Sequence, residues 1–462
     1  MKGVFISILL FVTCSVAAGQ NASISEISIT DGLKTQSKII RRELPFAVGD
    51  TLSMESLRTK VLQGKENLMN TSLFNSVEIS LIELHRDTLC TSFRVDIALE
   101  ERWYTWPVFE MRLEDRNMSS WVKKMDWKRI TYVGGIKVSN MFGLGHKLEL
   151  RGKFGWERGG NIKYSRVPIG RYKKWYLAAE FETFSNKHAD YITINDKPLQ
   201  LSSQHTIYST IGANASITFR PDIRTRHSLN LSYSHQKIDN TLLEANKEYW
   251  GNGGLKRDVT ALTYNFTYDQ RDYIYYPTTG FMIGGELHLE QANSFSFRYG
   301  RATMDMQYYS PVSQRWFWSS RIKLSASAKN RNAYLYNKAV GYGNANICGF
   351  ELYVIDGEHF ITQNNSLSYL ILPKKSFYLG LFPKWRKINR PHITIYGKVM
   401  SDFGYVWSKN QFIGNKYPNK FLAGWGAAID IVSYYDIVIN FGYGVNNWGR
   451  NHFIFGFKSP IF

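Results

Sequence analysis

The sequence predicts a mainly β protein: a transmembrane antiparallel β-barrel of about 16 strands, preceded by one small α+β domain. Segments of about 10 residues that alternate apolar residues with polar residues or glycine recur from Trp103 to Phe462, as barrel strands do. A different pattern, with helical spacing of apolar residues, occupies residues 20–101. Apart from a short N-terminal run, no stretch approaches the ~20 apolar residues that a spanning helix needs.

The N-terminus has the pattern of a secretory signal peptide. Lys2 precedes an apolar run over residues 4–12, and small residues at 16–19 suit cleavage, which predicts a signal peptide at residues 1–19. Cys14 offers the alternative of a lipoprotein, but the usual small residue just before the cysteine is missing. An exported chain with many alternating strands and no spanning helix predicts an integral outer-membrane protein of a double-membraned bacterium, with its first domain in the periplasm.

Residues 20–101 predict a small sheet that two helices cover on one side. Ile40 and Leu44 lie at helical spacing, and Ser53 is suited to cap a second helix. The predicted order is β-α-α-β-β, with elements near residues 24–30, 34–44, 53–70, 74–82 and 93–99.

The barrel strands are predicted by a period of two. In residues 262–269, Leu, Tyr, Phe and Tyr share one face, whereas Thr, Asn, Thr and Asp share the other. Residues 147–154 and 437–445 divide in the same way. A soluble sandwich would not usually repeat this division so often, whereas in a barrel the apolar face meets lipid and the polar face meets a wet lumen.

The alternating segments form an even set, as a closed antiparallel barrel of this kind requires. The candidate strands lie near residues 103–114, 130–141, 146–156, 160–169, 173–185, 203–220, 226–238, 258–270, 279–291, 295–310, 314–328, 358–372, 392–407, 421–433, 435–446 and 450–462. The longest connection, near residues 329–357, follows the eleventh strand and is predicted on the outside of the membrane.

Composition agrees with a barrel and disfavours other classes. Aromatic residues make up 15% of the chain and hydrophobic residues only 44%, which is too few for a bundle of spanning helices. The formal net charge of +19 could suggest nucleic acid, but export and the even spread of basic residues favour lipid head groups or a cationic lumen, so no nucleic-acid partner is expected. Cys90 and Cys348 are predicted to be free thiols.

Several short motifs carry a resemblance to a known family. Residues 42–46 (Arg-Glu-Leu-Pro-Phe) and 67–75 (Asn-Leu-Met-Asn-Thr-Ser-Leu-Phe-Asn) resemble a POTRA domain. Residues 269–280, with Asp-Gln-Arg-Asp and Tyr-Pro before a glycine, 349–351 and 401–407 resemble the barrel half of the same family. In this order and spacing, the motifs make the chain similar to the BamA/TamA-type POTRA-barrel superfamily, the bacterial surface antigen family, as a single-POTRA member.

With the signal peptide predicted at 1–19, the resemblance implies a periplasmic POTRA domain at 20–101 and a 16-stranded transmembrane barrel at 102–462. It implies a factor for outer-membrane protein assembly or polypeptide translocation, which binds clients by strand addition and opens at a weak seam between its first and last strands. Unfolded outer-membrane or secreted polypeptides are the expected clients. Periplasmic chaperones, accessory lipoproteins and outer-membrane lipid are further expected partners, and no cofactor is implied. The alternative is a passive channel or structural barrel that kept the fold and lost this role.

Catalysis is not predicted. Glu286, His288 and Glu290 share one strand face and could in principle bind a metal or exchange protons, but a hydrophilic lumen face accounts for them more simply. The chain has no Gly-x-Ser-x-Gly, His-Glu-x-x-His or Cys-x-x-Cys motif. A lipid-modifying barrel enzyme, a third alternative, would need an acid–base or nucleophile set that the sequence does not reveal.

Prolines mark both strands of the predicted seam. Pro107 lies in the first barrel strand and Pro460 in the last, and a proline cannot donate to a strand ladder. The periplasmic end of the seam is therefore predicted to be short of hydrogen bonds, unless both positions face away from the partner strand. The last strand carries the predicted C-terminal strand signal: Phe453, Phe455 and Phe457 in register, and Phe462 as the final residue.

One motif departs from the family. Where the long loop normally reads Val-Arg-Gly-Phe or Val-Arg-Gly-Tyr, this chain has Ile347, Cys348, Gly349 and Phe350. The family's arginine would reach a lumen aspartate, which resemblance assigns here to Asp402, in the same strand motif as Gly404. Because a thiol is a weak donor, we expect either another basic lumen residue in this role or a more mobile loop that Cys348→Arg would tighten. A specialised paralogue is also expected.

Overall fold

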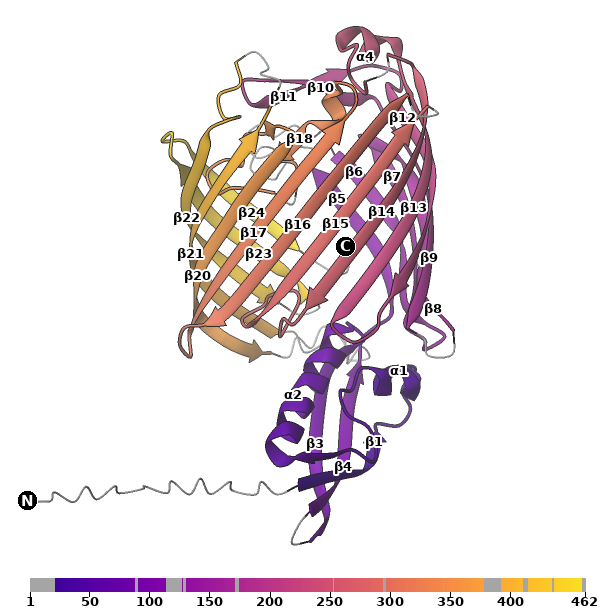
Figure 1. Cartoon of the computed structure of the whole chain (residues 1–462), viewed down its shortest axis with the longest axis vertical. Coiled ribbons are helices and arrows are strands. Elements are labelled where there is room, and N and C mark those ends of the chain that lie inside the picture. Colours follow the sequence, from indigo (N-terminus) through magenta and orange to yellow (C-terminus); the bar gives the residue numbers. More distant parts are fainter. Residues whose placement is uncertain are drawn as a thin grey trace, which may run out of the picture.

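A computed structural model shows a small α+β domain below a large β-barrel (Figure 1). It describes residues 21–87, 90–113, 127, 130–170, 174–251, 253–293, 296–343, 345–377, 392–409, 414–433 and 436–458. The predicted signal peptide lies outside these residues. We call the barrel end that faces the small domain proximal and the opposite end distal. Within the described residues, none of the helices has the length and apolar character needed to cross a membrane.

The small domain is a four-stranded sheet with two helices. Its elements are β1 (Asn21–Ile29), α1 (Ser37–Arg42), β2 (Thr51–Ser53), α2 (Met54–Asn70), β3 (Phe74–Arg86) and β4 (Cys90–Glu101). The sheet order is β2-β1-β4-β3, with β1 parallel to β4 and the other neighbours antiparallel. The predicted order lacked the short strand β2, and α1 is shorter than predicted, because only its middle turn buries apolar residues.

The second helix forms where its cap predicts. The Ser53 side chain accepts a hydrogen bond from the Ser56 backbone N–H, which satisfies one of the free donors of the first turn. The buried residues Leu57 and Leu68 then lie on the face of α2 that meets the sheet. The core between helices and sheet also contains Ile24, Ile39, Ile40, Phe74, Val77, Val95 and Ile97.

The barrel is one antiparallel sheet of 16 strands, as predicted. Its strands are β5 (Thr105–Leu113), β6 (Ile130–Met141), β7 (His146–Gly155), β8 (Glu157–Ile169), β9 (Trp175–Asn186), β12 (Tyr208–Phe219), β13 (Thr225–Ile238), β14 (Lys256–Asp269), β15 (Gly280–Ala292), β16 (Phe297–Pro311), β17 (Trp316–Lys329), β20 (His359–Ser376), β21 (His392–Trp407), β22 (Phe421–Ser433), β23 (Val438–Asn446) and β24 (Asn451–Lys458). Each strand pairs with the next in the chain's order of barrel strands.

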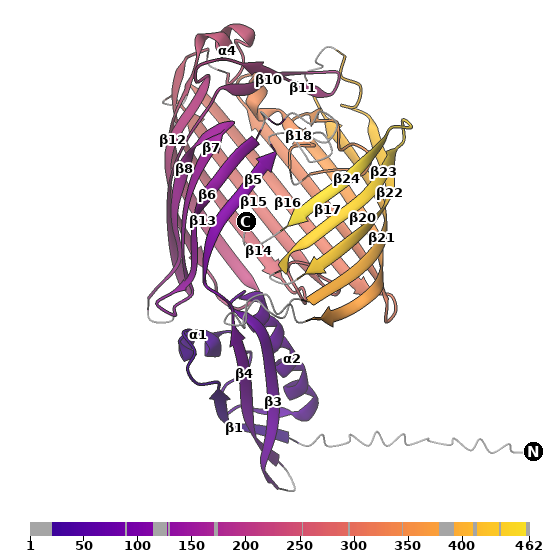
Figure 2. The same cartoon turned by 180° about the vertical axis from the view of Figure 1, so that it is seen from behind.

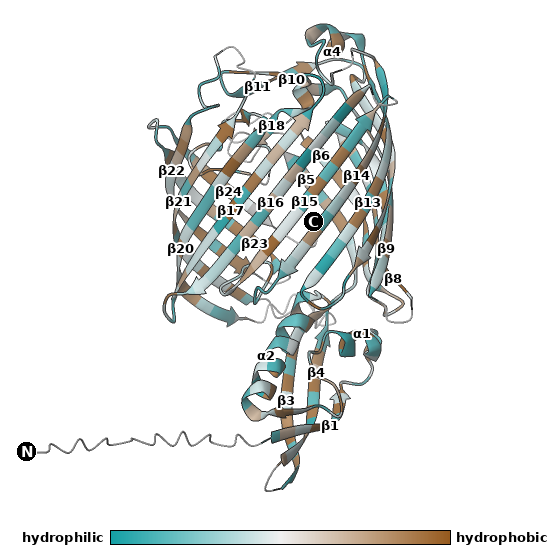
Figure 3. Ribbon diagram, viewed as in Figure 1, coloured by the Kyte–Doolittle hydropathy of each residue, from teal (hydrophilic) through white to brown (hydrophobic). Residues whose placement is uncertain are grey.

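The two barrel faces differ as the alternation predicts, and hydrophobic and hydrophilic bands follow one another along the strands in Figure 3. On the outer face Leu262 and Tyr264 are exposed, as lipid-facing residues should be. On the lumen face Arg151 pairs with Glu149 at 3.3 Å and with Glu110 at 3.7 Å. Charged side chains therefore satisfy one another across strands inside the barrel.

The distal end carries elements that the sequence pattern did not predict. They are a hairpin of β10 (His188–Ile194) and β11 (Lys197–Ser202), helix α4 (Asn240–Ala245), the 3-10 helix η1 (Tyr334–Tyr336), and a short pair of β18 (Lys338–Val340) and β19 (Ile355–Asp356). The hairpin lies across the barrel opening in Figure 1. The Asp196 carboxylate at its tip accepts backbone N–H groups of Lys416 and Tyr417 at 2.9 and 3.3 Å, so the hairpin is tied to the opposite wall.

Candidate functional site: the seam, the lumen loop and the domain joint

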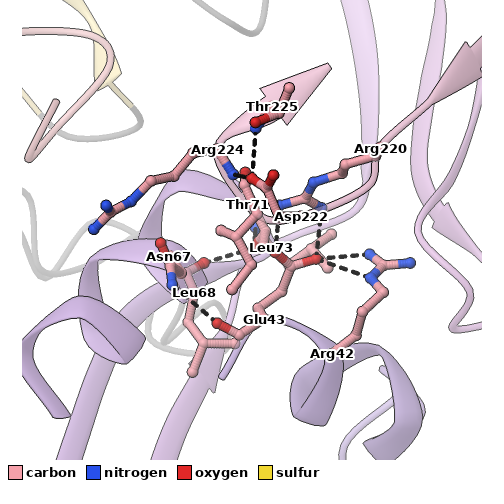
Figure 4. A network of polar contacts seen from close by, with 11 residues as sticks. Arg42, Glu43, Asn67, Leu68, Thr71, Leu73, Arg220, Asp222, Arg224 and Thr225 are labelled. Atoms are coloured by element: carbon pink, nitrogen blue, oxygen red, sulfur yellow. Dashed lines mark hydrogen bonds and ion pairs between the residues drawn. The ribbon is translucent and has the colours of Figure 1, made fainter. Parts of the chain in front are cut away.

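The small domain is joined to the barrel by a buried carboxylate. Glu43, 1% exposed, accepts hydrogen bonds from Arg42 at 2.8 Å and from Arg220 of the barrel at 2.7 Å (Figure 4). Burial disfavours the charge on Glu43, but the guanidiniums of Arg220 and Arg42 outweigh that cost and hold the pKa of the carboxyl below its ordinary value. Such a buried, charge-assisted pair fixes the domain under the proximal end of the barrel.

A second ion pair joins the domain to the far side of the seam. Arg102, between β4 and β5, donates to Asp436 in the turn before β23, with Nη1 2.6 Å from Oδ2. Tyr273, in the turn between β14 and β15, donates to the same carboxylate. Asp436 therefore holds three chain segments together at the proximal end.

The first and last barrel strands are not paired with each other in the part of the chain that the structure describes. β5 pairs only with β6, and β24 pairs only with β23. These terminal strands have nine and eight residues, whereas β20 on the far wall has 18. Figure 2 shows them as the two ends of the sheet, with the far wall visible between them. Within the described residues, the backbone donors and acceptors on the outer edges of β5 and β24 have no ladder partner.

Some of the predicted seam residues lie in the described parts of β5 and β24, and others lie outside the described residues. Pro107 lies in β5 opposite Ile136 and is exposed, and Phe453 in β24 is 74% exposed. Phe455 pairs with Phe441, and the Phe457 backbone pairs with Ile439 of β23. Pro460 and Phe462 lie outside the described residues, so the proposed shortage of hydrogen bonds at Pro460 stays a prediction.

The structure brings the predicted loop motif and its strand partner together. Cys348 is 4% exposed, and its backbone N–H donates to Asp402 Oδ2 at 2.9 Å. Ile347 packs against Gly404 so closely that a Cβ at position 404 would overlap its side chain. The loop connecting β17 and β20 is thus held against β21 by the hydrogen bond to Asp402 and by the packing of Ile347 on Gly404.

The side chain of Cys348 does not take the place of the family's arginine. The backbone N–H of Cys348 itself donates to the Asp402 carboxylate, a donor that the sequence analysis did not consider. The Cys348 sulfur points at a different surface, the glycines of β22 and β23. Greater mobility of the loop than in relatives, and its tightening by Cys348→Arg, stay predictions.

Glycines of β22 and β23 form the floor on which the loop rests. A Cβ at Gly424 would overlap the carbonyl oxygen of Cys348, and a Cβ at Gly426 or Gly444 would lie 2.6 Å from its sulfur. From β23, Asn446 donates to the carbonyl of Gly349 at 2.7 Å. Sequence reasoning missed this floor, although glycines at alternate positions of two neighbouring strands are the signal of a close backbone approach.

The aromatic end of the loop motif packs against two aromatic rings at the distal end of the barrel. The Phe350 ring lies edge-on to Tyr417, with centroids 5.2 Å apart, and edge-on to Trp448 at 5.8 Å. These rings belong to the loop before β22 and the turn after β23, so the loop is held at the distal ends of these two neighbouring strands.

The acidic and histidine row of β15 takes part in lumen hydrogen bonds. His288 Nδ1 lies 2.9 Å from the Thr263 hydroxyl, and Glu290 accepts a hydrogen bond from Tyr336 in η1. Among the described residues, no three histidine, cysteine, aspartate or glutamate side chains are arranged to hold a metal ion.

Comparisons with known proteins agree with this architecture. Residues 140–357 match the Omp85 superfamily domain. The structure resembles BamA from Haemophilus ducreyi lacking POTRA domains 1–3, with a TM-score of 0.51 and 15% identity over 94% of this chain and 84% of that one. It resembles CdiB from Escherichia coli with a TM-score of 0.53 and 14% identity over 94% and 75% of the two chains. Residues 140–357 therefore carry an Omp85 superfamily domain, and the chain has the fold of a BamA-like outer-membrane β-barrel preceded by one small POTRA-like domain.

Proposed function

We propose that this protein inserts β-barrel clients into the outer membrane by opening its barrel at the seam between β5 and β24. The observation that carries the proposal is the missing ladder between these strands within the described residues, where every other neighbouring pair of barrel strands is hydrogen-bonded. A client strand could pair with the free backbone groups of β5 or β24, because an exposed strand edge is a template for a new strand.

The covered distal end favours a sideways path over a path through the lumen. The β10–β11 hairpin is tied to the opposite wall by Asp196, and the Phe350 ring packs on Tyr417 and Trp448. A chain leaving distally would have to break these contacts. A chain leaving through the seam would break no ladder between β5 and β24 in the described structure.

The POTRA-like domain offers an edge at which a client could first bind. β3 is an edge strand of 13 residues, whereas the opposite edge, β2, has only three. Ile82 and Leu84 of β3 are exposed and would contact an added strand. We propose that unfolded outer-membrane polypeptides dock here, delivered by periplasmic chaperones or accessory lipoproteins, before they reach the seam. No covalent step or cofactor is part of this mechanism.

The proposal is tested by reconstitution. The mature chain in liposomes is given an unfolded barrel client with a periplasmic chaperone, and insertion is followed by the client's heat-modifiable mobility on gels. We expect insertion above that of protein-free liposomes. Ion conductance is measured on the same liposomes, because a passive channel would conduct without inserting clients, and that combination of results would overturn the proposal.

A further inference from the structure

A chamber between the POTRA-like domain and the proximal end of the barrel has a volume of about 570 Å³. Helices α1 and α2 form one side, and the proximal ends of β8, β9, β12, β13 and β14 form the other. This volume lies in the range of small-molecule sites, about 300–1,000 Å³.

The chamber carries a surplus of positive charge. Six arginines line it: Arg42, Arg166, Arg220, Arg224, Arg226 and Arg271. Only three carboxylates do so, Glu43, Glu66 and Asp269. The surplus is formally three positive charges, in a place where neighbouring protein limits the screening by water.

Part of this charge is neutralised by ion pairs and part is not. Glu43 binds Arg42 and Arg220, and Asp269 binds Arg271 at 2.6 Å. Arg166, Arg224 and Arg226 form no ion pair and no side-chain hydrogen bond within the part of the chain that the structure describes. In Figure 4 the Arg224 guanidinium extends away from Glu43, whereas those of Arg42 and Arg220 converge on it.

The free guanidiniums come from neighbouring parts of the barrel wall. Arg166 is at the proximal end of β8, Arg224 is in the turn before β13, and Arg226 is in β13 itself. Arg166 and Arg226 are exposed into the chamber, so their donors are available to a ligand. From the domain side, the Arg42 Nη1 atom is buried with no hydrogen-bond partner in the described structure. Like charges held this close repel one another, and a bound anion would relieve the repulsion.

We propose that this chamber binds a phosphate group, either of an anionic phospholipid head group or of a free phosphate. An arginine fork matches two phosphate oxygens in a bidentate manner, and both a phospholipid head-group phosphate and a free phosphate present at least two such oxygens and at least one negative charge. Because the chamber walls come from both the domain and the barrel, the bound phosphate would also strengthen the joint between them.

Binding is measured by calorimetry on the full mature chain in an uncharged detergent, so the test does not depend on the proposed insertase role. One arm titrates inorganic phosphate at constant ionic strength against chloride. The other compares phosphatidylcholine nanodiscs with and without phosphatidylglycerol. Saturable binding of inorganic phosphate assigns a free phosphate, and binding only of phosphatidylglycerol assigns a lipid head group. A third titration uses a hexaglutamate peptide, which offers carboxylates in place of phosphate.

Arg166→Gln combined with Arg226→Gln should weaken binding by tenfold or more, since each lost charge-assisted contact contributes about tenfold. Arg315→Gln, which removes an exposed arginine from a proximal turn outside the chamber, should change it by less than about twofold. Arg166→Lys with Arg226→Lys keeps the charge and should lie in between. Unchanged affinity in the double glutamine variant, or binding of hexaglutamate without binding of either phosphate source, would overturn the proposal.

Discussion

Arg102 Nη1 lies 2.6 Å from Asp436 Oδ2, and this contact spans the proximal end of the barrel seam. Arg102 immediately precedes the segment that leads into β5, whereas Asp436 precedes β23, the only described partner of β24. The Arg102 Nε also donates to the Phe74 carbonyl at 2.8 Å. The ion pair therefore connects the POTRA-like domain with both sides of the seam, and we infer that it restrains seam opening.

Breaking this pair should loosen the proximal end. Arg102→Gln and Asp436→Asn should each lower the free energy of unfolding by about 3–5 kcal/mol, because each leaves a buried charge unpaired. A double-mutant cycle in urea should give a positive coupling energy. The exposed pair Arg86–Glu83 in the hairpin of β3 and β4 is the control, with an expected coupling below about 1 kcal/mol. Equal coupling in the two cycles would show that Arg102–Asp436 is no restraint.

The glycine floor should be intolerant of side chains. Gly424→Ala places a Cβ on the carbonyl oxygen of Cys348, so the loop must move away from β22. In a Cys90→Ser background, a maleimide should label Cys348 in Gly424→Ala membranes far faster than in the parent. Gly285→Ala is the matched control, since a Cβ there meets nothing within 4 Å. Slow labelling in both variants would contradict the proposed docking surface.

The domain joint should weaken in acid. The pKa of Glu43 is lowered below its ordinary 4.5 in the folded protein, so its contribution is fully present above that value. It is lost as the pH falls from 4.5 through the lower folded pKa. Hydrogen exchange of residues 34–44 should therefore quicken across this window, relative to residues in the middle of α2.

Glu43→Gln should produce the same rapid exchange at neutral pH, because Arg42 and Arg220 would lose their shared carboxylate. Glu55→Gln, an exposed acid on α2, should have no effect. A Glu43→Gln protein that exchanges like the parent at every pH would show that the joint does not rest on this carboxylate.

Local pattern predicted most of the fold, but not the contacts that assemble it. The strands at 130–141, 392–407 and 421–433 were predicted with the bounds found, because a lipid face and a lumen face impose a strict period of two. The β10–β11 hairpin was missed, since a segment beyond the membrane need not alternate in this way. The Glu43–Arg220 pair joins residues 177 positions apart, and no periodicity connects such positions.

The loop illustrates the same limit. The resemblance brought Ile347, Cys348 and Asp402 into one prediction, and the structure places them together. It assigned the contact to a side chain, however, whereas a backbone N–H makes it. Which atom of the loop meets Asp402 depends on how closely the loop approaches β22 and β23, and that approach is set by glycines whose role only the three-dimensional packing reveals.

The central claim, that the barrel works by opening between β5 and β24, is tested most directly by locking the seam. Phe109→Cys on β5 is combined with Phe453→Cys or Phe455→Cys on β24, in a Cys90→Ser, Cys348→Ser chain whose activity is measured first. The variant that forms a disulfide should lose client insertion when oxidised and regain it on reduction, whereas each single-cysteine chain stays active. A fully oxidised, cross-linked barrel that still inserts its client at the parent rate would contradict the account.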